Sequence, residues 1–322
     1  MIVARFDADS LARVRLSPSP VCEANAWLRL TASGGRHPVF GDPGASARSA
    51  LRDPDAALVA AVLPRSGRGY SPDLLTPKPL RGKGKQVLGD QLDRIAATAP
   101  DVVADQVSWT GRPMPASVRR AVDDGTFAVR AAGGIMRFWA AAIADGWTEL
   151  TATIDADLAA RAATMAGHGV GAMLDSLHDN ISWAGDTLTV RSVWQEEFRL
   201  DGVEVVCAPA VLSWPTLSVQ LCDPREAVLC YPAAGVGASR PAPDTGSLDR
   251  LLGPTRAALL GDLDAPRSTA DLSRRHRLSA PTVSYHLAVL RKAALVGSRR
   301  DGQYVLYHRT DGGTDLMRRA TR

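Results

Sequence analysis

The sequence predicts two domains: an N-terminal α+β domain, with helices followed by a mainly antiparallel sheet, and a smaller C-terminal domain of helices and one hairpin. Three observations support this. The chain has 322 residues, and single cores rarely grow past about 250–300 residues. Near residue 180 the apolar spacing changes from a helical period to alternation. A Pro- and Gly-rich linker, residues 235–247, separates residues 1–234 from residues 248–322.

The first part of the N-terminal domain is predicted to be mainly helical. Met1–Phe6 has the composition of a strand, and Asp7 can cap a short helix after it. Helices are expected at residues 21–30 and 54–63. Residues 64–86 are rich in Pro, Gly, Lys and Arg and are predicted to be an exposed loop, because they lack the Gly-Lys-Ser/Thr sequence of a phosphate-binding loop.

A long amphipathic helix is expected at residues 148–165, where Leu150, Ile154, Leu158 and Ala162 recur every four residues. A shorter helix is expected at 169–177. After it the apolar residues alternate, which predicts short strands separated by turns. The predicted strands are Ile181–Trp183, Thr187–Val193, Val203–Pro209, Leu217–Leu221 and Ala227–Tyr231.

Two helices joined by a tight turn are predicted within residues 268–292. Ser268 can cap the first helix, and Asp271 three residues later favours its positive end. Ser279 can cap the second, and Pro281 falls in its first turn, where a missing N–H costs nothing. These signals place both helix starts.

The second helix has two unlike faces. Val283, Leu287 and Leu290 recur at helical spacing, so one face is expected to be buried. Small and hydrogen-bonding side chains with a cation further along suit a helix that lies in the major groove of DNA. That outer face carries Pro281, Ser284, Tyr285, Ala288 and Lys292.

A hairpin and a leading helix complete the C-terminal domain. Asp301-Gly302 is a strong hairpin-turn signal, and Arg299 and Arg300 precede it. Residues 248–263 form an amphipathic pattern that predicts a helix ahead of the two described above. Together these elements predict a winged helix-turn-helix, in which the hairpin is a basic wing.

Several segments resemble the ArsR-type (arsenic-repressor-like) transcriptional regulators. These are Leu-Gly-Pro-Thr-Arg-Ala-Ala-Leu-Leu at 252–260, Ser-Ala-Pro-Thr-Val-Ser-Tyr-His-Leu-Ala-Val-Leu-Arg-Lys-Ala-Ala-Leu-Val at 279–296, and Arg-Asp-Gly in the wing. The resemblance covers roughly a fifth of the chain. Residues 6–15, 154–161 and 206–215 also resemble an N-terminal domain that certain bacterial regulators of this type carry.

The resemblance and the residues together imply a sequence-specific DNA-binding transcriptional regulator: a homodimeric repressor whose N-terminal domain responds to a non-metal signal. Its expected partner is a double-stranded DNA operator. Two alternatives stay open, a winged-helix module that binds protein, and a ligand-binding protein with a vestigial DNA-binding domain. The expected DNA contacts are Ser268, Thr269, Ser279, Ala280, Pro281, Thr282, Ser284, Tyr285, His286, Arg291, Lys292, Arg299, Arg300 and Tyr304.

The charge distribution favours nucleic acid bound at one end of the chain. Residues 241–322 hold 14 Lys and Arg against 8 Asp and Glu, whereas residues 1–240 hold 24 against 26. A small basic domain beside a nearly neutral larger one is typical of a protein whose DNA contacts are confined to the small domain.

No cofactor or metal site is predicted. The four cysteines, Cys22, Cys207, Cys222 and Cys230, have no zinc-binding spacing. They are expected to be buried small hydrophobes, while a disulfide switch among Cys207, Cys222 and Cys230 stays open. Metal-sensing relatives place ligands on the first helix of the motif or on a long last helix; here residues 268–273 hold no Cys, and residues 310–322 are short and broken by Gly.

No catalytic site is predicted in the N-terminal domain. His178 and Asp179 could orient a base, but no Ser or Cys nucleophile lies in an elbow motif nearby, and His178 is expected to satisfy helix-end carbonyls. All seven tryptophans lie in this domain. Core packing and an aromatic-lined pocket for an apolar or planar small-molecule effector are both open interpretations.

The chain is predicted to be cytoplasmic and to dimerise. It has no apolar run of about 20 residues and no signal-peptide pattern at its start. The helix after the wing is reduced to about eight residues around Leu316 and Met317, too few turns to form an interface unaided. The N-terminal domain is therefore expected to supply much of the dimer contact, with strands 217–221 and 227–231 as candidates.

Overall fold

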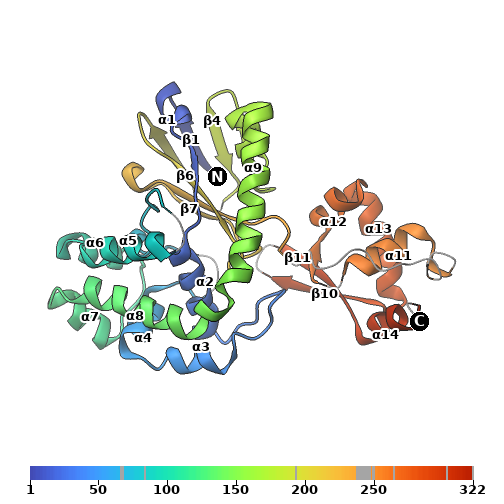
Figure 1. Cartoon of the computed structure of the whole chain (residues 1–322), viewed down its shortest axis with the longest axis horizontal. Coiled ribbons are helices and arrows are strands. Elements are labelled where there is room, and N and C mark those ends of the chain that lie inside the picture. The colour runs from blue at the N-terminus through green and yellow to red at the C-terminus, as the bar shows by residue number, and fades with distance from the viewer. Residues whose placement is uncertain are drawn as a thin grey trace. The chain divides into compact units, whose positions relative to one another are not determined.

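The computed structural model describes residues 1–65, 69–82, 85–192, 194–236, 248, 251–263, 265–301 and 304–320 (Figure 1). The chain divides into two compact units, Met1–Ala234 and Gly235–Arg322. Each has its own hydrophobic core. The linker residues 237–247 lie outside the described residues.

The helical part of the N-terminal unit is centred on α8, Phe127–Ala142, which packs against α2, α3, α4 and α5. The approach of α8 to α4 depends on Gly134, where a Cβ would lie 2.4 Å from the backbone of Asp55. Arg130 also pairs with Asp55, at 2.6 Å. The other helices here are α2 (Pro20–Ala32), α3 (Gly44–Ala50), α4 (Pro54–Val62), α5 (Lys85–Ala96), α6 (Pro100–Ser108) and α7 (Ala116–Asp123).

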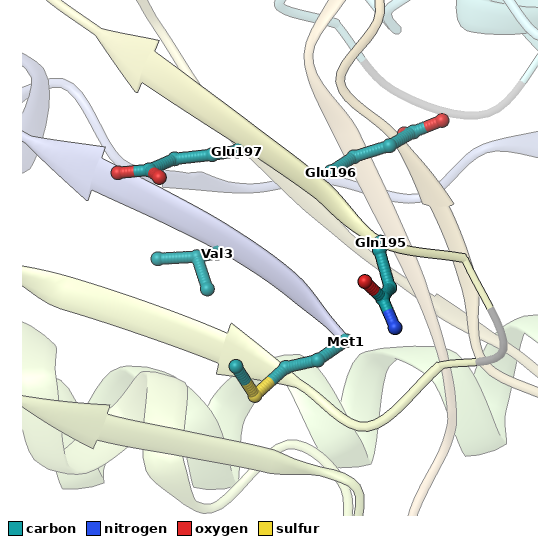
Figure 2. Close-up of a pocket in the computed structure, with 5 residues that line it drawn as sticks. All are labelled: Met1, Val3, Gln195, Glu196 and Glu197. Carbon is teal, nitrogen blue, oxygen red and sulfur yellow. The ribbon is translucent and has the colours of Figure 1, made fainter.

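The first of two sheets in this unit has the strand order β3-β4-β1-β5. Its strands are β1 (Ile2–Phe6), β3 (Ile181–Ala184), β4 (Thr187–Val190) and β5 (Glu196–Leu200). The short helix α1 (Ala8–Ala12) follows β1, and its Asp7 cap accepts from the Ser10 N–H as predicted. A pocket opens beside β1 and β5, lined by Met1, Val3, Gln195, Glu196 and Glu197 (Figure 2).

The second sheet has the order β2-β6-β8-β7. Its strands are β2 (Arg15–Leu16), β6 (Val206–Ala210), β7 (Ser218–Gln220) and β8 (Val228–Pro232). The predicted α+β class, with helices preceding most strands, is confirmed. Of the six strand pairings described in this unit, three are parallel: β1 with β5, β2 with β6 and β6 with β8. The sheets are therefore mixed. Two of the parallel pairs join a strand from the start of the chain, β1 or β2, to a later strand. Strands β2 and β5 were not predicted.

The long helix α9, Trp147–Asp175, links the helical part to the sheets (Figure 1). The two helices predicted at 148–165 and 169–177 are one element with a bend at Gly169, whose φ of 86° and ψ of 167° are not helical. Its end packs into a core shared by both sheets. Among the described residues no single helix combines the length and apolar composition of a membrane span; α8 and residues 144–175 meet that test only as a pair, across a bend of 60°.

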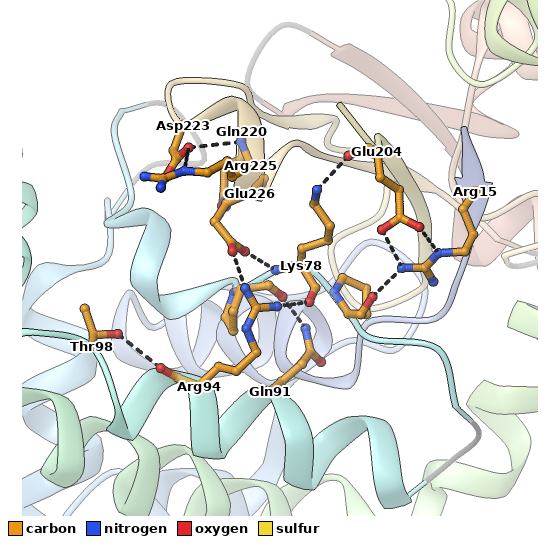
Figure 3. Close-up of polar contacts among 12 residues, drawn as sticks. Arg15, Lys78, Gln91, Arg94, Thr98, Glu204, Gln220, Asp223, Arg225 and Glu226 are labelled. Carbon is orange, nitrogen blue, oxygen red and sulfur yellow. Dashed lines mark hydrogen bonds and ion pairs between the residues drawn. The ribbon is translucent and has the colours of Figure 1, made fainter. Parts of the chain in front are cut away.

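The predicted exposed loop 64–86 is wrong for residues 72–79, most of which are buried. Lys78 is only 8% exposed. Its Nζ donates to the Glu204 carbonyl at 2.6 Å, and its backbone N–H donates to Glu226 at 2.9 Å (Figure 3). Arg15 and Arg94 pair with the same two glutamates. The ammonium group of Lys78, one of the charges that predicted a solvated loop, therefore lies within a polar network at the start of β6 and β8. Burial lowers the pKa of Lys78.

The described part of the C-terminal unit contains helices and a three-stranded sheet of order β10-β11-β9. The helix predicted at 248–263 is broken at Gly253, whose φ of 82° and ψ of 149° are not helical. Gly253 precedes Pro254, and the residue before a proline is disfavoured in the helical conformation. The elements are α11 (Pro254–Asp262), β9 (Arg267–Ser268), α12 (Thr269–His276), α13 (Ala280–Lys292), β10 (Val296–Asp301), β11 (Tyr304–Arg309) and α14 (Asp311–Ala320).

Glu23 joins α2 to the segment after β6. Its side chain is fully buried, and its two oxygens accept the backbone N–H groups of Val211 at 2.6 Å and Leu212 at 2.7 Å. Burial raises the pKa of Glu23 to about 7, although the two backbone hydrogen bonds lower it.

Glu23→Gln should lower the free energy of unfolding of the full chain by about 1–3 kcal/mol. Glutamine has nearly the same volume, but its NH₂ group replaces one carboxylate oxygen and places a donor against a backbone N–H. Urea unfolding followed by circular dichroism measures this. The exposed Glu149→Gln is the control and should change stability by no more than about 0.5 kcal/mol. Equal stability of both variants would contradict the role given to Glu23.

Candidate nucleic-acid interface

The start of α12 is held by a capping box. Ser268 Oγ accepts the Asp271 N–H at 3.1 Å, and the Asp271 carboxylate accepts the Ser268 N–H at 3.2 Å. The helix ends at Arg277, whose φ of 53° is left-handed. Ser279 then caps α13 through the Thr282 N–H at 3.3 Å, with Pro281 in the first turn. The predicted caps of both helices are present.

The inner face of α13 is buried as predicted. Val283 and Leu287 are inaccessible to solvent and Leu290 is 1% exposed. They pack with Leu272 of α12 and with Leu259 and Leu260 of α11. Because this apolar stripe is buried, the opposite face of α13 must point away from the core of the unit.

The outer face of α13 is exposed. Tyr285 is 62% exposed, and its ring lies edge-on to that of His286 at 5.3 Å. His286 is half-buried, and within the described residues its Nδ1 has no hydrogen-bond partner. The other predicted contact residues exposed on α13 are Ala280, Pro281, Ser284, Arg291 and Lys292.

Other predicted contact residues have structural roles within the unit. The Ser268 hydroxyl also donates to Asp271, at 2.7 Å. The hydroxyls of Ser279 and Thr282 lie 2.7 Å apart and bond to each other. Thr269, the first residue of α12, is half-buried. The hydroxyls of Ser268, Ser279 and Thr282 are therefore already engaged in hydrogen bonds at the two helix starts.

Arg299 and Arg300, which are adjacent in sequence, differ in their positions on the wing. Register pairs Arg299 with the buried Leu306 and Arg300 with the exposed Val305. Paired residues share a face of a sheet, so Arg299 and Arg300 project from opposite faces. Arg300 is exposed. Arg299 is half-buried, and two of its guanidinium nitrogens have no hydrogen-bond partner among the described residues. The turn residues 302–303 and the Tyr304 side chain lie outside the described part of the chain.

A carboxylate at the end of α11 links this helix to α12, a contact that the sequence pattern does not reveal. Asp262 Oδ2 lies 2.6 Å from Arg275 Nε and 3.1 Å from His276 Nε2. Arg267, only 4% exposed, pairs with Asp262 Oδ1 at 3.3 Å. Burial would raise the pKa of Asp262, but the hydrogen bonds from His276 and Arg275 and the nearby charges outweigh it and lower the pKa to about 2.

Within the described residues, no three His, Cys, Asp or Glu side chains come together as a metal site. The pocket in Figure 2 contains two glutamates and no tryptophan. The tryptophans divide between the core, as with Trp139, and the surface, as with Trp109 and Trp194. His178 Nδ1 accepts the Asn180 N–H at 3.0 Å, so this nitrogen serves a local turn.

The comparisons agree with the geometry of the C-terminal unit. A family model described as a helix-turn-helix domain matches residues 251–299. The matched segment contains α11, α12, α13 and the first part of β10. Comparison with curated proteins finds no match, and comparison with solved structures finds none. Residues 251–299 are thus a helix-turn-helix domain, followed by a β-hairpin, and this fold is typical of DNA-binding regulators.

Asp262→Asn should destabilise the C-terminal unit by about 1–2 kcal/mol, because Arg267, Arg275 and His276 lose the carboxylate with which they pair. The folded pKa lies below the ordinary value of 3.8. The contribution is therefore present above about pH 4 and is lost as the pH falls through 2. Urea unfolding of both proteins between pH 7 and pH 2 should show the difference shrink over that window. The exposed Asp311→Asn is the control, and a pH-independent difference would contradict the assignment.

Proposed function

We propose that this protein is a homodimeric, sequence-specific transcriptional repressor of the ArsR type, in which α13 reads a DNA operator and the N-terminal unit responds to a non-metal signal. The observation that carries the proposal is the exposed face of α13 within a matched helix-turn-helix domain. Tyr285 stands 62% exposed on this face, beside the exposed Ser284. Both can reach base edges from the major groove.

The cations are proposed to hold the DNA backbone. Arg291 and Lys292 lie at the end of α13 and Arg300 on the wing, and all three are exposed. Such contacts position a protein without reading sequence. The starts of α12 and α13, capped by Ser268 and Ser279, would contribute backbone N–H groups to phosphates, since helix N-termini favour anions. Arg299 is proposed to contact the minor groove from the other face of the wing.

The balance of base and phosphate contacts can be tested with two variants. Lys292→Ala should weaken binding to all DNA sequences alike and reduce the magnitude of the salt slope by about one. Tyr285→Ala should relax base preference and cost about 1–3 kcal/mol on the best operator. Mobility shifts in a salt series, on an operator selected from random DNA, measure both.

Two matched variants control this experiment. Arg225→Ala removes an 89% exposed arginine side chain of the N-terminal unit and should leave the salt slope unchanged. Leu251→Ala removes a 67% exposed side chain that is not on α13 and should leave base preference unchanged. A chain that binds no DNA at low salt would sink the proposal and favour a protein-binding role for the motif.

Dimerisation is proposed to depend on the N-terminal unit. Met317 of α14 is 5% exposed and packs with Leu316 into the core of its own unit, so the described side chains of this short helix offer a partner little apolar surface. Of the two strands predicted to contribute to the dimer contact, β8 lies between β6 and β7 and has no free edge. β7 is at the edge of its sheet and stays a candidate.

Light scattering should therefore give a dimer for the full chain and a monomer for residues 241–322. A two-fold operator requires two recognition helices spaced by about one DNA turn, roughly 34 Å. The isolated fragment should accordingly lose most of its operator affinity. A tight dimer of residues 241–322 with full affinity would contradict this account.

A further inference from the structure

Two cysteines from distant parts of the chain are in contact inside the N-terminal unit. Cys22 lies in the first turn of α2 and Cys230 in β8, and their Sγ atoms are 2.6 Å apart. Cys22 is 8% exposed and Cys230 6% exposed, and they share a small cluster with Ala208 and Val228. A disulfide bond measures about 2.05 Å, so a small displacement would close it.

The fold excludes the other two cysteines from this contact. Register pairs Ala208 with Cys230, so Cys207, the neighbour of Ala208, faces the opposite side of the sheet. There it lies in the core shared with α9. Cys222 is exposed and follows β7. A disulfide switch among Cys207, Cys222 and Cys230 therefore does not fit this geometry. The spacing of the cysteines in the sequence does not reveal that α2 covers this face of β8.

We propose that Cys22 and Cys230 are a thiol–disulfide redox pair, oxidised by small hydroperoxides to a bond that joins α2 to β8. Their burial restricts the reaction to a small oxidant. The contact with Cys22 and burial hold the pKa of the Cys230 thiol well above its usual range. Cys22 is therefore assigned as the attacking sulfur, and Cys230 as the sulfur that then reacts with the sulfenic acid.

The reaction balances in two steps. The Cys22 sulfur attacks the peroxide oxygen and the O–O bond breaks; a sulfenic acid forms, and the leaving oxygen takes the Cys22 thiol proton and departs as water or an alcohol. The Cys230 sulfur then attacks the sulfenic sulfur, the S–O bond breaks, and the hydroxyl leaves as water with the Cys230 thiol proton. Both sulfurs are oxidised and the peroxide is reduced.

Cys230 lies in the strand that precedes the end of the N-terminal unit. Just beyond it, the Tyr231 hydroxyl donates to Asp157 of α9 at 2.6 Å, and the Ala234 N–H donates to the same carboxylate at 2.8 Å. Ala234 is the last residue of the N-terminal unit. Oxidation would fasten to α2 the strand that leads into the DNA-binding unit. A signalling role for this bond rests on the function proposed above. The formation of the bond itself does not depend on that function.

The test uses the full chain, treated with hydrogen peroxide, alkylated under denaturing conditions and digested without reductant. Mass spectrometry should find one intramolecular link between the peptides of Cys22 and Cys230, reversed by dithiothreitol. Cys22→Ser and Cys230→Ser should abolish it, while Cys222→Ser and Cys207→Ser should keep it. A wild-type chain whose Cys22 and Cys230 remain alkylatable, or that links other cysteines, overturns the proposal without reliance on any variant.

The signalling role has a separate readout. Operator affinity should differ between reduced and oxidised wild-type protein, and should not respond to peroxide in Cys22→Ser, whose fold is checked by circular dichroism. A disulfide that forms without changing affinity overturns the signalling role. Failure of the reduced protein to bind any DNA would instead sink the proposed function and leave the redox pair in place.

Discussion

The burial of one apolar stripe on α13 governs everything proposed for the C-terminal unit. Val283, Leu287 and Leu290 have almost no exposed surface, and burial of each such side chain contributes about 1.5–3 kcal/mol. Rotating α13 would expose all three, so its orientation is strongly determined. The exposed position of Tyr285 follows from this burial. The caps on Ser268 and Ser279 and the ion cluster on Asp262 then fix where the helices start and how α11 meets α12.

The N-terminal unit depends on a different kind of contact. Its helices and sheets are joined by buried polar groups that reach between segments far apart in sequence. Glu23 bonds to the backbone after β6, Lys78 bonds to residues before β6 and β8, and Asp157 bonds to the end of β8. A buried polar group is costly unless its partners are in place. Such contacts therefore make the packing of α2, α9 and the second sheet specific. The Asp157 contacts lie at the end of β8, where the chain leaves this unit.

Much of the C-terminal site could be predicted because its signals are local. Ser268 and Asp271 are three residues apart and form the expected capping box, and the apolar spacing in α13 identified its buried face. The same reasoning was less reliable where neighbouring residues were grouped by type. Arg299 and Arg300 are adjacent cations, yet strand alternation places them on opposite faces of the wing. The helix expected at 248–263 failed at Gly253, where local backbone angles outweigh the apolar pattern.

By itself, the sequence determined the helix caps, the buried stripe of α13, the wing and the α+β class of the first unit, since each follows from periodicity or from residues a few positions apart. Tertiary structure alone decided which distant residues meet. It brought Cys22 to Cys230 across 208 positions, gathered Arg267, Arg275 and His276 on Asp262, and buried Lys78 in a segment that composition predicts to be exposed. The reason is physical: caps and amphipathic faces are set within a helix or strand, whereas the partner of a buried thiol or charge depends on how whole elements pack.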